Sequence, residues 1–140
     1  FDKKLKAVQT GGPAGGCIPY DLMDTPIDYE SLQEVGSIMG SGGLIVLDED
    51  DCIVDIVKFF MSFCQDESCG KCYPCRIGSF RGMELLQKAQ NSTYKIGRQL
   101  FDDLLDTLEI GSLCALGGGV PLPVKNALEY FDEELKGYFK

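Results

Sequence analysis

The segment Ser68-Cys69-Gly70-Lys71-Cys72-Tyr73-Pro74-Cys75-Arg76 carries three cysteines at strict intervals of three residues. This spacing lets one short loop aim three thiolates at a compact inorganic core. A [4Fe–4S] cluster has four iron corners, so it requires one further thiolate. The candidate is Cys114, which stands alone in a second loop that begins at Gly111 and ends at Gly117. We therefore predict a chain that moves electrons through one [4Fe–4S] cluster, held by Cys69, Cys72, Cys75 and Cys114.

Two other kinds of cysteine chemistry compete with this prediction. Structural zinc sites usually pair two distant Cys-x2-Cys units, whereas here three cysteines are contiguous and the fourth is solitary. The zinc alternative would make the chain a zinc-stabilised helical interaction module without a redox role. A thiol–disulfide enzyme would instead need one cysteine of low pKa in a Cys-x2-Cys pair. The seven cysteines are an odd number, which argues against a secreted disulfide scaffold.

The remaining three cysteines are assigned no ligand role. Cys52 and Cys64 fall among Ile, Val and Phe in an expected helix, where a cysteine is usually a small core residue. Cys17 follows the glycines Gly15 and Gly16, and the sequence does not determine its role. Cys114 is preferred over all three because its loop contains small residues that let the backbone approach a cluster.

Composition excludes several classes of function. The formal net charge of −9 argues against binding to phosphate backbones, so no nucleic-acid partner is expected. The chain has no histidine, which removes the usual general base and the usual nitrogen ligand of zinc. No apolar run approaches the roughly 18–20 residues of a membrane span. Clustered cysteines without a visible secretion signal are typical of a reducing compartment, so we expect a cytoplasmic location.

Residues 1–47 differ in character from the rest of the chain. Short strands are expected over residues 5–10 and 17–19, and a two-turn helix between Asp28 and Val35, capped by Asp28 and ended by Gly36. The apolar run Leu44-Ile45-Val46-Leu47 is typical of a buried strand. So few strands do not stand alone. The segment is expected to be the tail of a small α+β domain, or a piece that packs on the helical part.

Residues 48–140 are expected to be helical. Acidic residues 48–51 are expected to cap a first helix that ends near Cys64, and Pro74 is expected to begin a second that ends near Ala89. Apolar residues at intervals of three and four predict a third helix over residues 94–108 and a fourth from Pro123 onward. The predicted fold is mainly α: a four-helix bundle iron–sulfur domain preceded by a short α+β fragment.

Two further features accompany the cysteines. Lys71, Arg76 and Arg81 are basic residues in an acidic chain; either they raise the reduction potential of a nearby cluster or they simply point into water. The glycine run over residues 11–16 lacks the Gly-Lys-Ser/Thr ending of a P-loop, so a turn is favoured over a phosphate site.

These motifs together resemble a known family. Residues 67–78, then Leu113-Cys114-Ala115-Leu116-Gly117 and Pro123-Val124, closely resemble the C-terminal part of the NADH-binding flavoprotein subunit of respiratory complex I. Relatives in NAD(P)-linked [FeFe]-hydrogenases and NAD-dependent formate dehydrogenases carry the same pattern. The glycine run at residues 11–16, with residues 40–46, looks like the end of the β-grasp-like domain that precedes the cluster domain there.

The resemblance implies a place in an electron-transfer chain. In the family an upstream domain binds NAD(P)H and FMN, the flavin passes electrons singly to the [4Fe–4S] cluster, and clusters in iron–sulfur partner subunits receive them. The ligands carry over to Cys69, Cys72, Cys75 and Cys114. No FMN or NAD(P) site is recognised in these 140 residues. The chain alone is therefore expected to be a relay point and not a catalyst, and whether it counts as an enzyme stays open.

Overall fold

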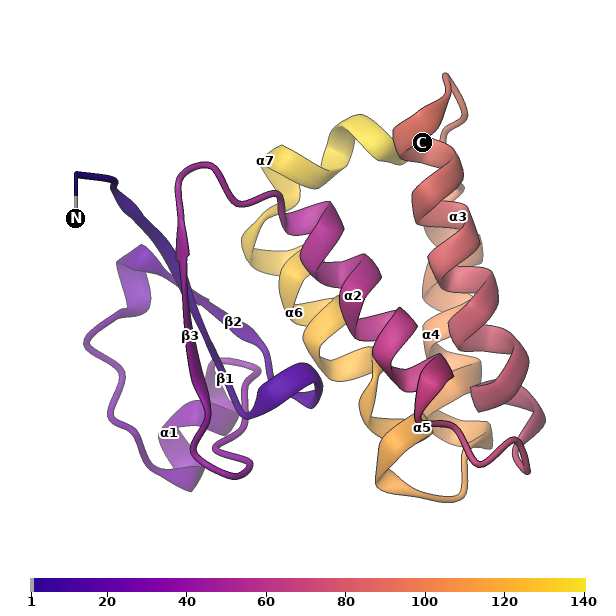
Figure 1. Ribbon diagram of the computed structural model, residues 1–140, viewed down its shortest axis with the longest axis horizontal. Coiled ribbons are helices and arrows are strands. Elements are labelled where there is room, and N and C mark those ends of the chain that lie inside the picture. Colours follow the sequence, from indigo (N-terminus) through magenta and orange to yellow (C-terminus); the bar gives the residue numbers. More distant parts are fainter. Residues whose placement is uncertain (1) are drawn as a thin grey trace.

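The computed structural model describes residues 2–140 and places a small sheet beside a group of helices (Figure 1). The sheet has the strand order β2-β1-β3, and both pairings are antiparallel. At its centre, Val8 lies opposite Ile18 on one side and Val46 on the other. The prediction of three short extended segments is confirmed, with these bounds: β1 (Leu5–Thr10), β2 (Cys17–Pro19) and β3 (Leu44–Asp48).

The prediction that the third strand is buried is wrong. Leu44, Ile45 and Val46 are 51%, 54% and 61% exposed, and among the apolar residues of β3 Leu47 alone is buried. The strand order explains the difference, since β3 pairs with β1 on one side and forms an edge of the sheet. An apolar run does not by itself distinguish a central strand from an edge strand, because that position depends on pairing with distant residues.

The predicted short helix of the N-terminal part is present as α1 (Tyr29–Glu34). The Asp28 carboxylate accepts a hydrogen bond of 2.7 Å from the Ser31 backbone N–H, which is the expected cap. Gly36 follows with a φ of 69°, a left-handed conformation that suits a helix end. Two 3₁₀ turns, η1 (Gly12–Ala14) and η2 (Tyr20–Leu22), complete this part.

The chain is mainly α, as predicted, but the helices are more numerous than a four-helix bundle implies. The described residues contain six α-helices after the sheet: α2 (Ile53–Asp66), α3 (Ser79–Asn91), α4 (Arg98–Gly111), α5 (Ala115–Gly119), α6 (Pro121–Tyr130) and α7 (Asp132–Leu135). Gly117, expected at the end of the Cys114 loop, belongs to α5 together with Gly118 and Gly119. The expected last helix is divided at Phe131, whose φ of −119° and ψ of 30° leave the helical region. A π-helical turn, η3 (Pro74–Gly78), precedes α3, and a 3₁₀ turn, η4 (Lys136–Tyr138), lies near the end of the chain.

Helix α2 begins differently from the prediction. Its N-cap is Cys52, whose side chain makes no capping bond, and the Asp51 carboxylate accepts from the Asp48 N–H and not from the helix. The first free N–H of the helix, on Ile53, donates to Glu134 Oε1 at 2.8 Å. The cap therefore comes from α7, 81 residues away in the sequence.

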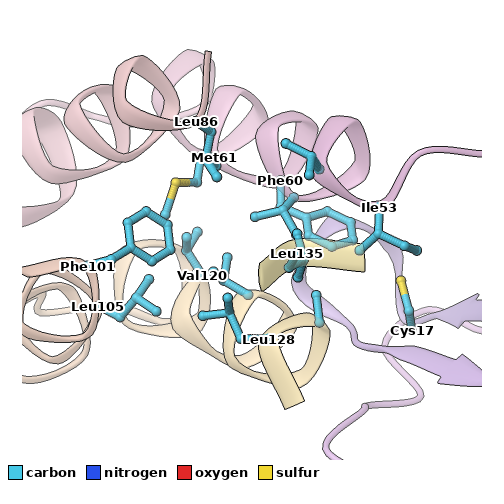
Figure 2. Close-up of a cluster of buried hydrophobic side chains, with 14 of the residues drawn as sticks. Cys17, Ile53, Phe60, Met61, Leu86, Phe101, Leu105, Val120, Leu128 and Leu135 are labelled. Atoms are coloured by element: carbon cyan, nitrogen blue, oxygen red, sulfur yellow. The ribbon is translucent and has the colours of Figure 1, made fainter. Parts of the chain in front are cut away.

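The sheet and the helices share one hydrophobic core. Cys17 from β2 is fully buried and belongs to the same cluster of buried side chains as Ile53 of α2 and Leu135 of α7 (Figure 2). The role of Cys17, open from the sequence, is therefore that of a core residue where the sheet meets the helices. Burial raises the pKa of its thiol to about 12. None of the helices within residues 2–140 has the length and apolar character needed to cross a membrane.

Candidate iron–sulfur site

The segment with three cysteines follows the end of α2 (Figure 1). Cys69 and Cys72 lie in a loop, and Cys75 belongs to the π-helical turn Pro74–Gly78. Gly70 has a φ of 75°, which allows a sharp turn directly after Cys69. The three thiols differ in exposure: Cys69 is exposed, Cys72 is half-buried and Cys75 is buried. This segment thus places the Cys69 thiol at the surface and the Cys75 thiol against the core.

The fourth predicted ligand lies on the neighbouring loop. Cys114 is exposed and occupies the N-cap position of α5, with an extended backbone and no capping bond from its side chain. One residue earlier, the Leu113 N–H points at the Cys72 sulfur with a nitrogen–sulfur distance of 3.4 Å. This contact joins the two cysteine loops, and its two residues are 41 apart in sequence. Backbone N–H donors to sulfur are a recurrent feature of iron–sulfur sites.

Gly117 of α5 permits this close approach. A Cβ at this position would lie 2.7 Å from Cys75 Cβ and 2.9 Å from Cys75 Sγ. The same atom would lie 2.7 Å from Ser112 Oγ. These distances are shorter than ordinary van der Waals contact, so any larger residue would push α5 and the π-helical turn apart.

Cys64 lies closer to the predicted site than its sequence context indicated. It is buried in α2, as expected for a core cysteine, but its sulfur is 3.9 Å from Cys75 Sγ. The Leu116 carbonyl oxygen lies 3.8 Å from the same sulfur. Burial, and then the neighbouring Cys75, raise the pKa of the Cys64 thiol to about 12, with a smaller contribution from Cys114. No spacing signal in the sequence could have identified this contact, since it depends on how α2 packs against the turn.

Two buried side-chain oxygens in the described residues have no hydrogen-bond partner: Gln65 Oε1 and Ser112 Oγ. Gln65 follows Cys64, and Ser112 precedes Cys114 by two residues. An unpartnered buried polar group costs about 1–3 kcal/mol, so its position usually has a reason. Both oxygens lie at the cysteine end of the molecule, where an additional group with polar sulfur atoms would give Ser112 a partner.

The side chains at this end of the molecule therefore have the chemical character that an iron–sulfur cluster requires. The four thiols lie on two neighbouring segments that are in contact, close backbone approach is permitted at Gly117, and the hydroxyl of Ser112 is available. Within residues 2–140, no three or more Cys, Asp or Glu side chains gather closely enough to hold a metal ion in the arrangement described. The assignment of the four individual ligands accordingly stays a prediction.

Two of the three basic residues contact neighbouring side chains. Arg81 pairs with Glu84 at 2.5 Å, and the Arg76 guanidinium lies over the Tyr73 ring, 5.8 Å from its centroid. Lys71 is exposed. Their predicted effect on a reduction potential stays a prediction.

Cys52 lies apart from this arrangement. It is half-buried at the start of α2, whereas the cysteine loop follows the opposite end of that helix. It packs against the edge of the hydrophobic core, in partial agreement with its expected role.

The sequence matches a protein-family model described as the NADH-ubiquinone oxidoreductase-F iron-sulfur binding region, over residues 55–138. This match includes both cysteine loops and nearly all of the helical part that follows the sheet. The chain therefore belongs to this family, and the resemblance found in its motifs is confirmed. The family supports a [4Fe–4S] cluster as the cofactor.

Individual proteins similar to this chain have names that fit the same family. The chain is 44% identical over 137 residues to the NADP-reducing hydrogenase subunit HndC of Solidesulfovibrio fructosivorans, covering 97% of this chain and 28% of that one. It is 35% identical over 134 residues to an NADH-quinone oxidoreductase subunit of Mycobacterium bovis, covering 94% and 30%. The chain thus spans less than a third of the length of these relatives.

A solved structure shares the fold. The crystal structure of an NAD⁺-reducing [NiFe]-hydrogenase in the H₂-reduced state superposes with a TM-score of 0.84 and 26% sequence identity. The superposition covers 99% of this chain and 24% of that chain. The same arrangement of sheet and helices is therefore also found inside a much longer redox protein.

Proposed function

We propose that this chain is an electron-relay region whose single [4Fe–4S] cluster is held by four cysteines: Cys69, Cys72, Cys75 and Cys114. The observation that carries the proposal is the contact of the two loops, in which the Leu113 N–H reaches the Cys72 sulfur at 3.4 Å. The family match supports an iron–sulfur role. The contact of the two loops supports these four residues over Cys17 and Cys52, while Cys64, whose sulfur lies 3.9 Å from that of Cys75, is buried within α2 and lies on neither loop. Cys17 is enclosed in the core and Cys52 lies at the far end of α2.

The residues around such a cluster would have different roles. A bound [4Fe–4S] cluster supplies one-electron storage. Cys75 is 5% exposed, so its side of the site excludes water and strengthens nearby electrostatic interactions. Cys69 and Cys114 are exposed, so their side of the site faces solvent or a partner. The residues thus support a cluster with one protected side and one accessible side.

Exposed apolar side chains beside the exposed cysteines support a partner at that side. Tyr73 and Leu113, each next to a predicted ligand in sequence, are 68% and 91% exposed, and Ile110 at the end of α4 is 85% exposed. Such side chains are typical of interaction surfaces. We propose that iron–sulfur partner subunits receive electrons here.

The source of the electrons is proposed from the relatives. Their names describe NADH- and NADP-linked oxidoreductases and hydrogenases, and they are more than three times as long as this chain. We propose that an upstream domain of the same protein binds FMN and NAD(P)H and that the flavin is the donor. In this scheme the protein works in the cytoplasm, and this chain is not itself the site of NAD(P)H oxidation.

The domain division belongs to the same proposal. Residues 1–47 would be the tail of a β-grasp-like domain, with Phe1 outside the described residues, and residues 48–140 the cluster-binding domain. The four longest helices, α2, α3, α4 and α6, support a four-helix core for the second part, with α5 and α7 as short additions.

The test is anaerobic reconstitution of the chain with iron and sulfide. About four irons per chain and a reducible paramagnetic signal are expected. Serine at any one of positions 69, 72, 75 or 114 should abolish the wild-type signal and lower the iron content. Cys52→Ser is the matched control, because serine suits the N-cap position that Cys52 occupies. A colourless wild-type chain with one zinc and no iron would overturn the proposal in favour of a zinc-stabilised module.

A further inference from the structure

Ser112 is an unusual residue in this site because its hydroxyl is buried yet unpartnered. It lies in the loop between α4 and α5, and its Oγ makes no hydrogen bond within residues 2–140. A serine hydroxyl usually finds a partner when it is buried, as Ser79 does with the Cys75 carbonyl at 2.6 Å. The donor capacity of Ser112 is therefore available to a further group.

The free hydroxyl lies near the sulfur of Cys75. Ser112 Oγ and Cys75 Sγ lie 2.7 Å and 2.9 Å from one point, the position that a Cβ on Gly117 would occupy. Both atoms thus pack against the Gly117 backbone. The absence of a side chain at Gly117 permits this close approach of Ser112 and Cys75.

Two other polar groups lie beside the Cys75 sulfur. Ser68 Oγ is 3.4 Å from it and accepts the Gly70 N–H at 3.2 Å, which leaves the Ser68 O–H able to donate to a thiolate at Cys75. Cys64 Sγ is 3.9 Å away and also lies 3.8 Å from the Leu116 carbonyl. Of the two serine hydroxyls, that of Ser112 is therefore the one that makes no hydrogen bond within residues 2–140.

We propose that the Ser112 hydroxyl donates a hydrogen bond to the cluster at its Cys75 corner and so sets the reduction potential of the relay. The inference rests on the proposed function, since it needs a cluster bound at Cys75. A thiolate bound to iron accepts hydrogen bonds and donates none, so the hydroxyl must be the donor. The bond becomes stronger when one electron enters the cluster and its negative charge grows. No covalent bond forms or breaks.

Burial makes this donor effective. Cys75 is 5% exposed, and in a site with little water a hydrogen bond is electrostatically stronger than in solvent. A hydrogen bond to a charged acceptor is strong enough to change an equilibrium constant by about tenfold. Loss of the bond is therefore expected to disfavour reduction about tenfold, which lowers the midpoint potential by about 59 mV for one electron.

The experiment compares variants of the full chain after anaerobic reconstitution. Ser112→Ala and Ser112→Val remove the hydroxyl, whereas Ser112→Thr keeps it on a side chain of the same shape as valine. The iron content and the midpoint potential are measured for each, the latter by titration with dithionite and detection of the paramagnetic signal. Ser41→Ala, in an exposed turn, is the control for a serine removed elsewhere.

The expected result is a lower potential in Ser112→Ala and Ser112→Val, with Ser112→Thr and Ser41→Ala close to wild type. The reduced wild type should also show a coupling to an exchangeable proton that disappears in heavy water and in Ser112→Ala. If alanine and valine remove the iron but threonine retains it, the hydroxyl contact is again supported.

Two results would overturn the inference without touching the proposed function. One is a four-iron cluster with the wild-type potential in Ser112→Ala; the other is loss of iron in all three Ser112 variants, which would indicate packing and not hydrogen bonding. A wild-type chain that takes up no iron would instead overturn the proposed function itself.

Discussion

The boundary between the sheet and the helices contrasts with the C-terminal end of α2. At the boundary, a buried polar side chain has partners: Asn126 of α6 is 3% exposed, accepts the Cys17 N–H at 2.8 Å and donates to the Val35 carbonyl at 3.0 Å. At the C-terminal end of α2, beside the cysteine loops, Gln65 Oε1 and Ser112 Oγ have none within the described part of the chain. Unpartnered polar groups concentrated at one end are typical of a functional site, since they serve a ligand at a cost in stability.

The cysteines show the same contrast. Cys17 lies in the fully partnered region, surrounded by core residues, and its thiol has only a packing role. Cys69 and Cys114 are exposed outside the core, so packing of their side chains does not stabilise the fold. The comparison shows that surroundings distinguish Cys17 from Cys69 and Cys114, whereas the prediction that the buried Cys75 is a ligand depends on its spacing in the sequence.

Gly117→Ala should have the largest effect, confined to the cysteine end. The added Cβ would lie 2.7 Å from Cys75 Cβ, so the turn and α5 must separate. We expect most of the reconstituted iron to be lost, as measured by elemental analysis and the visible absorption of the cluster. Gly119→Ala is the matched control, because its Cβ would meet nothing within 4 Å. Equal iron contents in the two variants would contradict the role given to Gly117.

Asn126→Ala should act on the other region. It leaves the Cys17 N–H and the Val35 carbonyl without partners, and we expect unfolding free energy to fall by about 2–4 kcal/mol in urea titrations. Asn91→Ala, at the exposed end of α3, should change stability by less than about 0.5 kcal/mol. A loss below about 1 kcal/mol for Asn126→Ala would mean that water replaces both bonds, and the contrast between the regions would weaken.

The effect of the Cys17 thiol is confined to alkaline solution. Its pKa is raised by burial to about 12 in the folded chain, against roughly 8.5 in an unfolded one. As the pH rises past about 9, the unfolded chain loses this proton first, so the stability present at lower pH is progressively lost toward pH 12. Cys17→Ala and Cys17→Val should therefore lose stability less steeply above pH 9, by up to about 1.4 kcal/mol per pH unit. Slopes equal to that of wild type would contradict the burial of this thiol.

Local signals in the sequence predicted much of the fold and the identity of the candidate ligands. The cap at Asp28 and the stop at Gly36 define α1, because both act within a few residues of the helix. The Cys-x2-Cys-x2-Cys run and the solitary Cys114 could likewise be singled out from spacing and loop context. The family match supports the cluster type, while the four ligands await the reconstitution experiment.

Features that depend on distant residues could not be predicted in this way. Glu134 caps α2 from 81 residues away, and Leu113 meets Cys72 from 41 residues away. The exposure of β3 follows from its place at the edge of the sheet, which pairing with β1 decides. The importance of Gly117 and Ser112 depends on how closely α5 approaches Cys75.

The sequence by itself thus determined that this protein is mainly helical, and it predicted four cysteines as ligands of one [4Fe–4S] cluster. The physical reason is that helix periodicity, capping and ligand spacing are short-range properties of the chain. The tertiary structure alone decided which thiol is buried, which hydroxyl is left without a partner and which strand faces outward. These features depend on packing between segments that are far apart in sequence. Local sequence patterns do not indicate which of those segments will be in contact.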